Sequence, residues 1–220
     1  MKALILSDIH SNFRAIQNIW QIERDSDRIY CAGDVVAYGP SPKETIEWLM
    51  SRQAVCVQGN HDLSVVSSYR QRGRSEEAPL FDQSMIYHNA SSLSEAHISF
   101  LEGLPASVTF SLDDIQYGMT HAVDDTILSA GSIQTYNLFV AQRFPSGSDG
   151  PVTRVLYGHS HRQAMSRPGE CAVWLNPGPA IAVVADPLHQ PNFLALRDGR
   201  AYYCTITDGT IELKHVEYHQ

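Results

Sequence analysis

The first 60 residues alternate short apolar runs with amphipathic stretches, and this order limits the chain to few folds. Strands are predicted at three apolar runs, residues 3–6, 29–32 and 54–57. Between them, Asn12 can cap a helix whose apolar residues recur at helical spacing, and Ser41-Pro42-Lys43-Glu44 has the form of a capping box for a helix through Met50. A strand–helix–strand–helix–strand order gives parallel strands with right-handed crossovers, so we predict an α/β fold.

Beyond this unit the pattern changes twice. Residues 64–105 are more polar and contain a second capping-box sequence, Ser92-Leu93-Ser94-Glu95, so we expect a partly helical insertion there. From about residue 107 strand signals dominate, at 108–112, 115–120, 152–157, 172–175, 192–196, 202–206 and 210–214. The turn pairs Asp198-Gly199 and Asp208-Gly209 separate the last three runs, which predicts an antiparallel meander. We find no repeat or linker and expect residues 1–220 to form a single domain.

The composition excludes several classes of protein. With 43% hydrophobic and 18% charged residues, the 220-residue chain is too apolar for a disordered protein. Its formal charge of −8 gives no general attraction to nucleic acid or to an anionic membrane. The first residues lack the apolar run of a signal peptide, no run is long enough to span a membrane, and the four cysteines form no CxxC pair. We therefore expect a cytoplasmic protein with reduced thiols and no membrane partner.

Polar side chains that can bind a metal follow directly after five predicted strands. They are Asp8 with His10, Asp34, Asn60 with His61 and Asp62, His121, and His159 with His161. Ligand sites in open α/β sheets form beyond the carboxyl ends of the strands, so we expect all five groups at one rim. Taken singly, each residue has an ordinary explanation, such as a turn aspartate or a hydrogen-bonded histidine. Five such groups at five strand ends favour a common site, which would use half of the ten histidines in the chain.

The spacing within these groups supports a metal site. Asp8 and His10, like His159 and His161, are two residues apart, so in extended backbone the side chains of each pair point to the same side. A glycine without Cβ precedes three of the groups and permits a tight turn; these are Gly33, Gly59 and Gly158. Carboxylate, amide and imidazole ligands without a thiolate favour Mn²⁺, Fe or Zn²⁺ over a structural cysteine–zinc site.

The order of these motifs resembles the full series of the calcineurin-like metallophosphoesterase superfamily, and more narrowly its small bacterial and archaeal phosphodiesterases. The matching segments are Asp8-Ile9-His10, Gly33-Asp34, Gly59-Asn60-His61-Asp62, His121, Gly158-His159-Ser160-His161 and the turn Leu175-Asn176-Pro177-Gly178. The resemblance implies a four-layer α-β-β-α sandwich of two mixed sheets. It also implies a hydrolase that cleaves a small phosphodiester, or a phosphomonoester, with a hydroxide bridging two divalent metal ions.

The resemblance further implies a role for each residue. The first metal ion would be held by Asp8, His10, Asp34 and His161, and the second by Asp34, Asn60, His121 and His159. A centre that consists of two divalent ions, two aspartates and a hydroxide has a net charge of about +1, which attracts an anionic substrate. His61 would be the general acid that protonates the leaving oxygen, with Asn60 beside it at the phosphate. Asp62, on our inference, would fix the orientation of His61.

Some positions depart from the family pattern. Tyr38 stands in the slot where protein Ser/Thr phosphatases and diadenosine tetraphosphatases carry an arginine. An arginine there would clamp a phosphate through two parallel hydrogen bonds, which a tyrosine cannot do, so we do not expect protein phosphatase activity. Ala122 and Pro179 replace a glycine and a serine that are common in the family.

Other functions and residues stay open at the level of sequence. The same fold could serve as a catalytically weak, metal-binding interaction scaffold, or the protein could be a nuclease. Arg14, one turn into the first helix, is a candidate for substrate binding, and a solvated helix position is the alternative. The cluster of Arg70, Arg72 and Arg74 is either a surface loop or a contact to an anionic substrate. The sequence is also compatible with a homo-oligomer.

Overall fold

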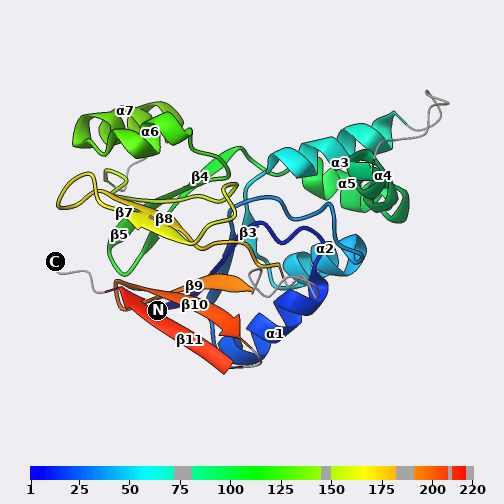
Figure 1. The fold of residues 1–220 in the computed structure, drawn as a ribbon, viewed down its shortest axis with the longest axis horizontal. Coiled ribbons are helices and arrows are strands. Elements are labelled where there is room, and N and C mark those ends of the chain that lie inside the picture. The colour runs from blue at the N-terminus through cyan, green and yellow to red at the C-terminus, as the bar shows by residue number, and fades with distance from the viewer. Residues whose placement is uncertain (72–80, 145–149, 182–190, 208–209, 217–220) are drawn as a thin grey trace.

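Two β-sheets pack face to face and helices cover their outer faces (Figure 1). This computed structural model describes residues 1–71, 81–144, 150–181, 191–207 and 210–216. In this part of the chain one sheet has the order β11-β10-β9-β1-β2-β3 and the other the order β4-β5-β6-β8-β7. Both sheets mix parallel and antiparallel pairs. The α/β class and the four-layer sandwich are therefore confirmed.

The first five elements follow the predicted order. They are β1 (Lys2–Leu6), α1 (Phe13–Glu23), β2 (Arg28–Cys31), α2 (Pro42–Ser51) and β3 (Val55–Cys56). The strands pair in parallel, β1 with β2 and β2 with β3. Asn12 caps α1 as predicted, because its Oδ1 accepts a hydrogen bond of 3.1 Å from the amide of Ala15. Ser41 precedes α2, but its side chain makes no capping hydrogen bond, so the predicted capping box is wrong there.

The predicted helical insertion contains three helices, α3 (Asn60–Arg70), α4 (Phe81–Ser92) and α5 (Glu95–Glu102). Ser94 caps α5, with Nδ1 of His97 accepting a hydrogen bond from the amide of Ser94. The predicted capping box at Ser92-Leu93-Ser94-Glu95 is therefore displaced by two residues, because Ser92 still belongs to α4.

The second sheet is built from β4 (Ser107–Leu112), β5 (Ile115–Thr120), β6 (Arg154–Leu156), β7 (Ala164–Ser166) and β8 (Val173–Asn176). The short edge strand β7 and the helices α6 (Asp125–Ala130) and α7 (Ile133–Arg143) were not predicted. Tyr136 is the sole buried residue of the two helices, and their other apolar residues, such as Ile133 and Phe139, are only partly buried. The last three strands, β9 (Asn192–Arg197), β10 (Arg200–Thr207) and β11 (Thr210–Val216), form the predicted meander. Its Asp208-Gly209 turn lies outside the described residues.

Alternate residues of the strands supply two separate cores. In β1, Leu4 and Leu6 pack against the helices, whereas Ala3 and Ile5 pack between the two sheets. A third cluster around Trp174 joins the second sheet to α7. A strand buried on both faces reads as a continuous apolar run, which explains the clear strand signal of the first residues.

All four cysteines carry free thiols. Among the described helices, none combines the length and the hydropathy that a membrane crossing requires.

Candidate metal centre

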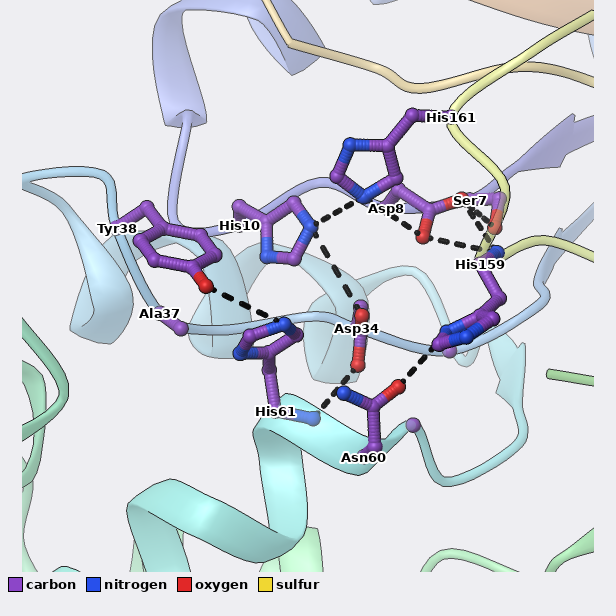
Figure 2. A network of polar contacts seen from close by, with 12 residues as sticks. Ser7, Asp8, His10, Asp34, Ala37, Tyr38, Asn60, His61, His159 and His161 are labelled. Atoms are coloured by element: carbon purple, nitrogen blue, oxygen red, sulfur yellow. Dashed lines mark hydrogen bonds and ion pairs between the residues drawn. The ribbon is translucent and has the colours of Figure 1, made fainter. Parts of the chain in front are cut away.

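Loops that follow strands of both sheets meet at one rim, where the predicted site residues lie together (Figure 2). Backbone hydrogen bonds join the loops within the first sheet, from the amide of Asp8 to the carbonyl of Gly33 at 3.0 Å and from His10 to Asp34 at 3.0 Å. The two sheets are linked by the amide of His159, which donates to Oδ1 of Asp8 at 3.0 Å. The positions of the candidate ligands are thus fixed by main-chain contacts as well as by side chains.

One group of possible ligand atoms comes from Asp8, His10, Asp34 and His161, and these atoms all lie within 4.8 Å of one another. The Nε2 atoms of His10 and His161 are 3.0 Å apart, and Nε2 of His161 is 3.4 Å from Oδ1 of Asp8. Three members are buried, and His161 is partly exposed. Lone-pair atoms of imidazole and carboxylate groups face one another here, which is the arrangement that a cation requires.

A second group consists of Asp34, His121 and His159. Nε2 of His121 lies 3.2 Å from Oδ2 of Asp34. Asn60 lies beside this group, with its Oδ1 3.1 Å from Nε2 of His121 and 3.0 Å from Nδ1 of His159. Asp34 therefore belongs to both groups. Together with Asn60, the two groups contain the residues that the family resemblance assigns to the metal site, and their oxygen and imidazole nitrogen atoms suit a divalent cation.

The backbone at these ligands is left-handed, contrary to the extended geometry predicted from their spacing. The φ angles are positive at Asp8 (50°), His10 (48°), Asp34 (53°), His159 (68°) and His161 (53°). Such angles are uncommon outside glycine, but Asp and His tolerate them better than most residues. The chain turns sharply at these five ligands, so the pairs two residues apart converge through tight turns. Backbone strain of this kind concentrates at functional sites.

Two glycines allow the loops to approach this closely. A Cβ atom at Gly59 would lie 2.1 Å from Oδ1 of Asp34, and one at Gly158 would lie 1.9 Å from Oγ of Ser7 and 2.8 Å from Oδ2 of Asp8. All three distances are shorter than the contacts that real Cβ atoms make. These two glycines therefore permit close contact as predicted, by making room for Asp34, Asp8 and Ser7. The third predicted glycine, Gly33, makes room for the ring of His121, whose Nδ1 would lie 2.6 Å from a Cβ atom there.

Burial and charge shift the pKa values of two candidate ligands in opposite directions. Burial lowers the pKa of His10 to about 4, although Asp34 and Asp8 favour its charged form. Burial also lowers the pKa of His121, but the hydrogen bond to Asp34 and the charge of that carboxylate outweigh it and raise the value to about 9. Without a cation, His121 thus holds a proton that screens Asp34, and a bound metal would take the place of that proton.

The structure gives Asp62 different partners from the predicted ones. Its side chain is fully buried, and its carboxylate accepts hydrogen bonds from the amides of Gly59 at 2.9 Å and Val36 at 3.0 Å. It therefore joins the loop after β3 to the loop after β2, whereas we predicted that it orients the imidazole of His61. Burial and the charge of Asp34 raise the pKa of Asp62 to about 7, against the opposite effect of these two hydrogen bonds.

His61 belongs to neither ligand group. Its backbone amide donates to Oδ1 of Asp34 at 2.9 Å, while its imidazole lies beside Tyr38 with Nε2 3.5 Å from the tyrosine hydroxyl (Figure 2). Its Nδ1 is buried without a hydrogen-bond partner in the described part of the chain. The ring of His61 also contacts that of His10, at a centroid distance of 5.1 Å. The imidazole thus borders the first ligand group without belonging to it.

The arginines considered as substrate contacts lie elsewhere or outside the described residues. Arg14 is exposed on the first turn of α1, and no hydrogen bond or ion pair in the described part of the chain joins it to a candidate ligand. Arg70 is engaged in ion pairs with Glu95 and Glu102. Arg72 and Arg74 fall within the segment that the structure does not describe.

Sequence reasoning assigned no role to two buried asparagines that support the site. Asn176 donates from Nδ2 to the carbonyl of Gly158 at 2.9 Å and to Oγ of Ser160 at 3.1 Å, which braces the turn that carries His159 and His161. Its place in the turn motif was the available signal. Asn89, in α4, contacts the loop after β2, and no local pattern marks it.

A family model and several known proteins match this chain. The family model of the calcineurin-like phosphoesterase superfamily domain matches residues 1–195. An uncharacterised protein of Methanocaldococcus jannaschii is 38% identical over 64 residues, which are 28% of this chain and 26% of that protein. A symmetrical bis(5'-nucleosyl)-tetraphosphatase of Colwellia psychrerythraea is 35% identical over 72 residues, 30% of this chain and 25% of that enzyme. The chain thus matches about a quarter of the length of these curated relatives.

Solved structures show the same fold over the whole chain. A metallophosphoesterase of Sphaerobacter thermophilus is 22% identical with a TM-score of 0.62, covering 100% of this chain and 90% of its own. Vps29 of Entamoeba histolytica is 18% identical with a TM-score of 0.57 and 100% coverage of both chains. At these identities the likeness concerns the fold alone.

Proposed function

The chain belongs to the calcineurin-like phosphoesterase superfamily, whose members are hydrolases of phosphoric esters, and on that premise we propose that it hydrolyses a small phosphodiester at a centre of two divalent metal ions. The observation that carries this proposal is the position of Asp34, whose carboxylate belongs to both groups of ligand atoms. A carboxylate shared in this way can bridge two cations. Two cations that are about 3.5–4 Å apart can clamp both the attacking and the leaving oxygen of a phosphate ester.

The ligand residues would hold the two ions as two overlapping sets. Asp8, His10, Asp34 and His161 surround one position, and Asp34, His121 and His159 with Asn60 surround the other. Mn²⁺, Fe and Zn²⁺ suit this mixture of oxygen and imidazole ligands. When bound, such ions supply a hydroxide nucleophile at neutral pH and neutralise charge on the phosphate.

His61 would supply the proton for the leaving oxygen. Its imidazole is not needed by either ligand group, and its backbone hydrogen bond to Asp34 keeps it next to the centre. Burial lowers the pKa of the His61 imidazole below its usual value, although the charge of Asp34 acts against this shift. The negative charge of a bound phosphate would favour the protonated imidazole, which can transfer its proton as the ester bond breaks. Asn60, as ligand and neighbour of His61, would lie against the phosphate.

Two observations weigh against the alternative functions. A metal-binding scaffold has no need of a general acid, and His61 lies here beside all seven candidate ligands. A nuclease that binds long nucleic acid needs a basic surface, and the formal charge of this chain is −8.

The free thiols of its four cysteines suit a cytoplasmic location.

The test combines metal content with activity. Protein stripped with a chelator is reloaded separately with Mn²⁺, Fe²⁺ and Zn²⁺, and the metal per chain is measured by mass spectrometry. Bis-p-nitrophenyl phosphate, p-nitrophenyl phosphate and single-stranded DNA are then offered as substrates. We expect two ions per chain and faster hydrolysis of the small diester than of either other substrate. Protein that binds two ions and hydrolyses nothing would support the scaffold instead.

A further inference from the structure

Tyr38 lies against the candidate centre at the side where His61 is found (Figure 2). The centroid of its ring is 5.1 Å from that of His10 and 4.8 Å from that of His61. Its hydroxyl is 3.5 Å from Nε2 of His61, and the residue is 38% exposed. A molecule that approaches both the centre and His61 therefore meets the tyrosine hydroxyl as well.

The loop that carries Tyr38 is held in an unfavourable backbone conformation. The φ angles are 97° at Ala37 and 56° at Tyr38, in the region that favours glycine. Residues held in such regions cost roughly 1–3 kcal/mol each and persist only where surrounding contacts enforce them. An ordinary surface turn would avoid this cost, so the position of Tyr38 is specifically maintained.

Hydrogen bonds from the loop after β1 and from α4 enforce this conformation. The buried amide of Ala37 donates to both Oγ of Ser11 and Oδ1 of Asn89, each at 3.2 Å. Nδ2 of Asn89 donates to the carbonyl of Gly39 at 3.1 Å, on the far side of Tyr38. The backbone of Tyr38 is thus fixed between two anchored neighbours, and its ring packs against those of His10 and His61.

The charge near the centre limits which esters it can neutralise. In the described part of the chain, no lysine or arginine forms a hydrogen bond or ion pair with a candidate ligand. The two metal ions of the proposed function, with Asp8, Asp34 and a hydroxide, would leave a net charge of about +1. A phosphodiester carries one negative charge and matches this value, whereas a monoester dianion carries two.

We propose that Tyr38 is a specificity-determining residue that selects phosphodiesters over phosphomonoesters. Its neutral hydroxyl donates a hydrogen bond to a phosphoryl oxygen of a singly charged diester. It adds no positive charge that could balance the second negative charge of a monoester. An arginine at position 38 would add a positive charge and could donate hydrogen bonds to two phosphoryl oxygens at once. The inference rests on the proposed function, because it assumes that phosphate esters bind at this centre.

Three variants test the inference. Tyr38→Arg adds the charge, Tyr38→Phe removes only the hydroxyl, and Tyr87→Arg is the matched control, since Tyr87 is an exposed tyrosine of α4. The ratio of kcat/KM for bis-p-nitrophenyl phosphate to that for p-nitrophenyl phosphate is measured for each metal-loaded protein. A readout independent of turnover is the Kd of inorganic phosphate for the same proteins, measured by calorimetry.

We expect Tyr38→Arg to lower the diester-to-monoester ratio by about tenfold and to tighten phosphate binding by a similar factor, the size of one charged hydrogen bond. Tyr38→Phe should lower kcat/KM for the diester by about fivefold with unchanged metal content, since a neutral hydrogen bond is weaker. Tyr87→Arg should change none of these values.

Other results would overturn the inference. A Tyr38→Arg protein with normal metal content, an unchanged ratio and unchanged phosphate affinity would show that Tyr38 does not sense substrate charge. A loss of metal from Tyr38→Phe would indicate a structural role instead. If the wild-type protein hydrolyses neither ester, the proposed function fails, and the phosphate Kd of the three variants still decides whether Tyr38 sets the charge preference.

Discussion

The carboxylate of Asp62 accepts a hydrogen bond of 3.0 Å from the backbone amide of Val36, 26 residues earlier in the chain. Its other oxygen accepts from Gly59 at 2.9 Å. One buried side chain thereby joins the loop that carries Asp34 to the loop that carries Asn60 and His61. The distance between the shared aspartate and the proposed general acid depends on this link.

Replacing Asp62 by alanine should therefore damage the protein before it affects chemistry. Asp62→Ala leaves two buried amides without an acceptor, and we expect it to lower the free energy of unfolding by about 2–4 kcal/mol. Asp62→Asn keeps one acceptor oxygen and should cost about half as much. Urea unfolding of the metal-free proteins measures both. An Asp62→Ala protein as stable as the wild type would contradict the bracing role.

Replacing Asp34 by asparagine should disrupt both metal positions at once. Asp34→Asn keeps the size of the side chain and an acceptor for the amide of His61, but it removes the charge shared by the two ligand groups. We expect fewer than two metal ions per chain and loss of most activity. Asp124→Asn, at the exposed cap of α6, is the control and should bind the wild-type amount. Full activity of Asp34→Asn with two ions would disprove a bridging role.

Removing the imidazole of His61 should separate metal binding from turnover. His61→Ala keeps the backbone amide that contacts Asp34, so the protein should retain both ions. Its kcat should fall by about 10²-fold or more, which is the usual contribution of a general acid. A substrate with a good leaving group needs less help from an acid and should show a smaller loss. A drop in metal content would instead mean that His61 is a ligand.

Metal binding should release a proton, because the raised pKa of His121 keeps that histidine charged in the metal-free protein. Its folded value of about 9 exceeds the ordinary value of 6.5, so its contribution to stability is complete below pH 6.5 and is lost as the pH rises through 9. We expect the unfolding free energy of metal-free protein to fall over this range while metal affinity rises.

Calorimetric titrations of metal in buffers with different ionisation enthalpies would count the released protons. His121→Asn should flatten the pH dependence of stability between pH 6.5 and 9. His88→Asn, at an exposed histidine of α4, should leave it unchanged. Proton release that persists in His121→Asn would assign the linkage to another group.

Replacing Ala37 by glycine should leave the free energy of unfolding nearly unchanged, whereas the same replacement at an alanine with negative φ should lower it. Ala37 has a φ of 97°, so Ala37→Gly relieves strain in the folded state while it adds freedom to the unfolded chain. We expect little change in the free energy of unfolding. Ala15→Gly, in the buried face of α1, should cost about 1 kcal/mol or more. Equal losses for the two variants would mean that the strain at Ala37 is small.

The sequence by itself determined the alternation of strands and helices in the first 60 residues and the set of residues that meet at the rim. Both follow from local rules, because apolar periodicity defines elements such as β1 and α1, and parallel strands bring their carboxyl ends to one edge. The capping role of Asn12 could also be predicted from the sequence, because its partner Ala15 lies only three residues away. Helices α6 and α7 could not be predicted in this way, because α6 has only six residues and the apolar residues of α7 are weakly segregated to one face.

Only the tertiary structure decided how the site residues contact one another. Asp62 contacts Val36, which is 26 residues away, and Asn89 contacts Ala37, which is 52 residues away. No sequence spacing encodes these contacts. The left-handed backbone at Asp34 and at Tyr38 is likewise imposed by such distant contacts against local preference. Residue types specify which chemistry is available, whereas long-range hydrogen bonds and close packing fix the distances and orientations on which that chemistry depends.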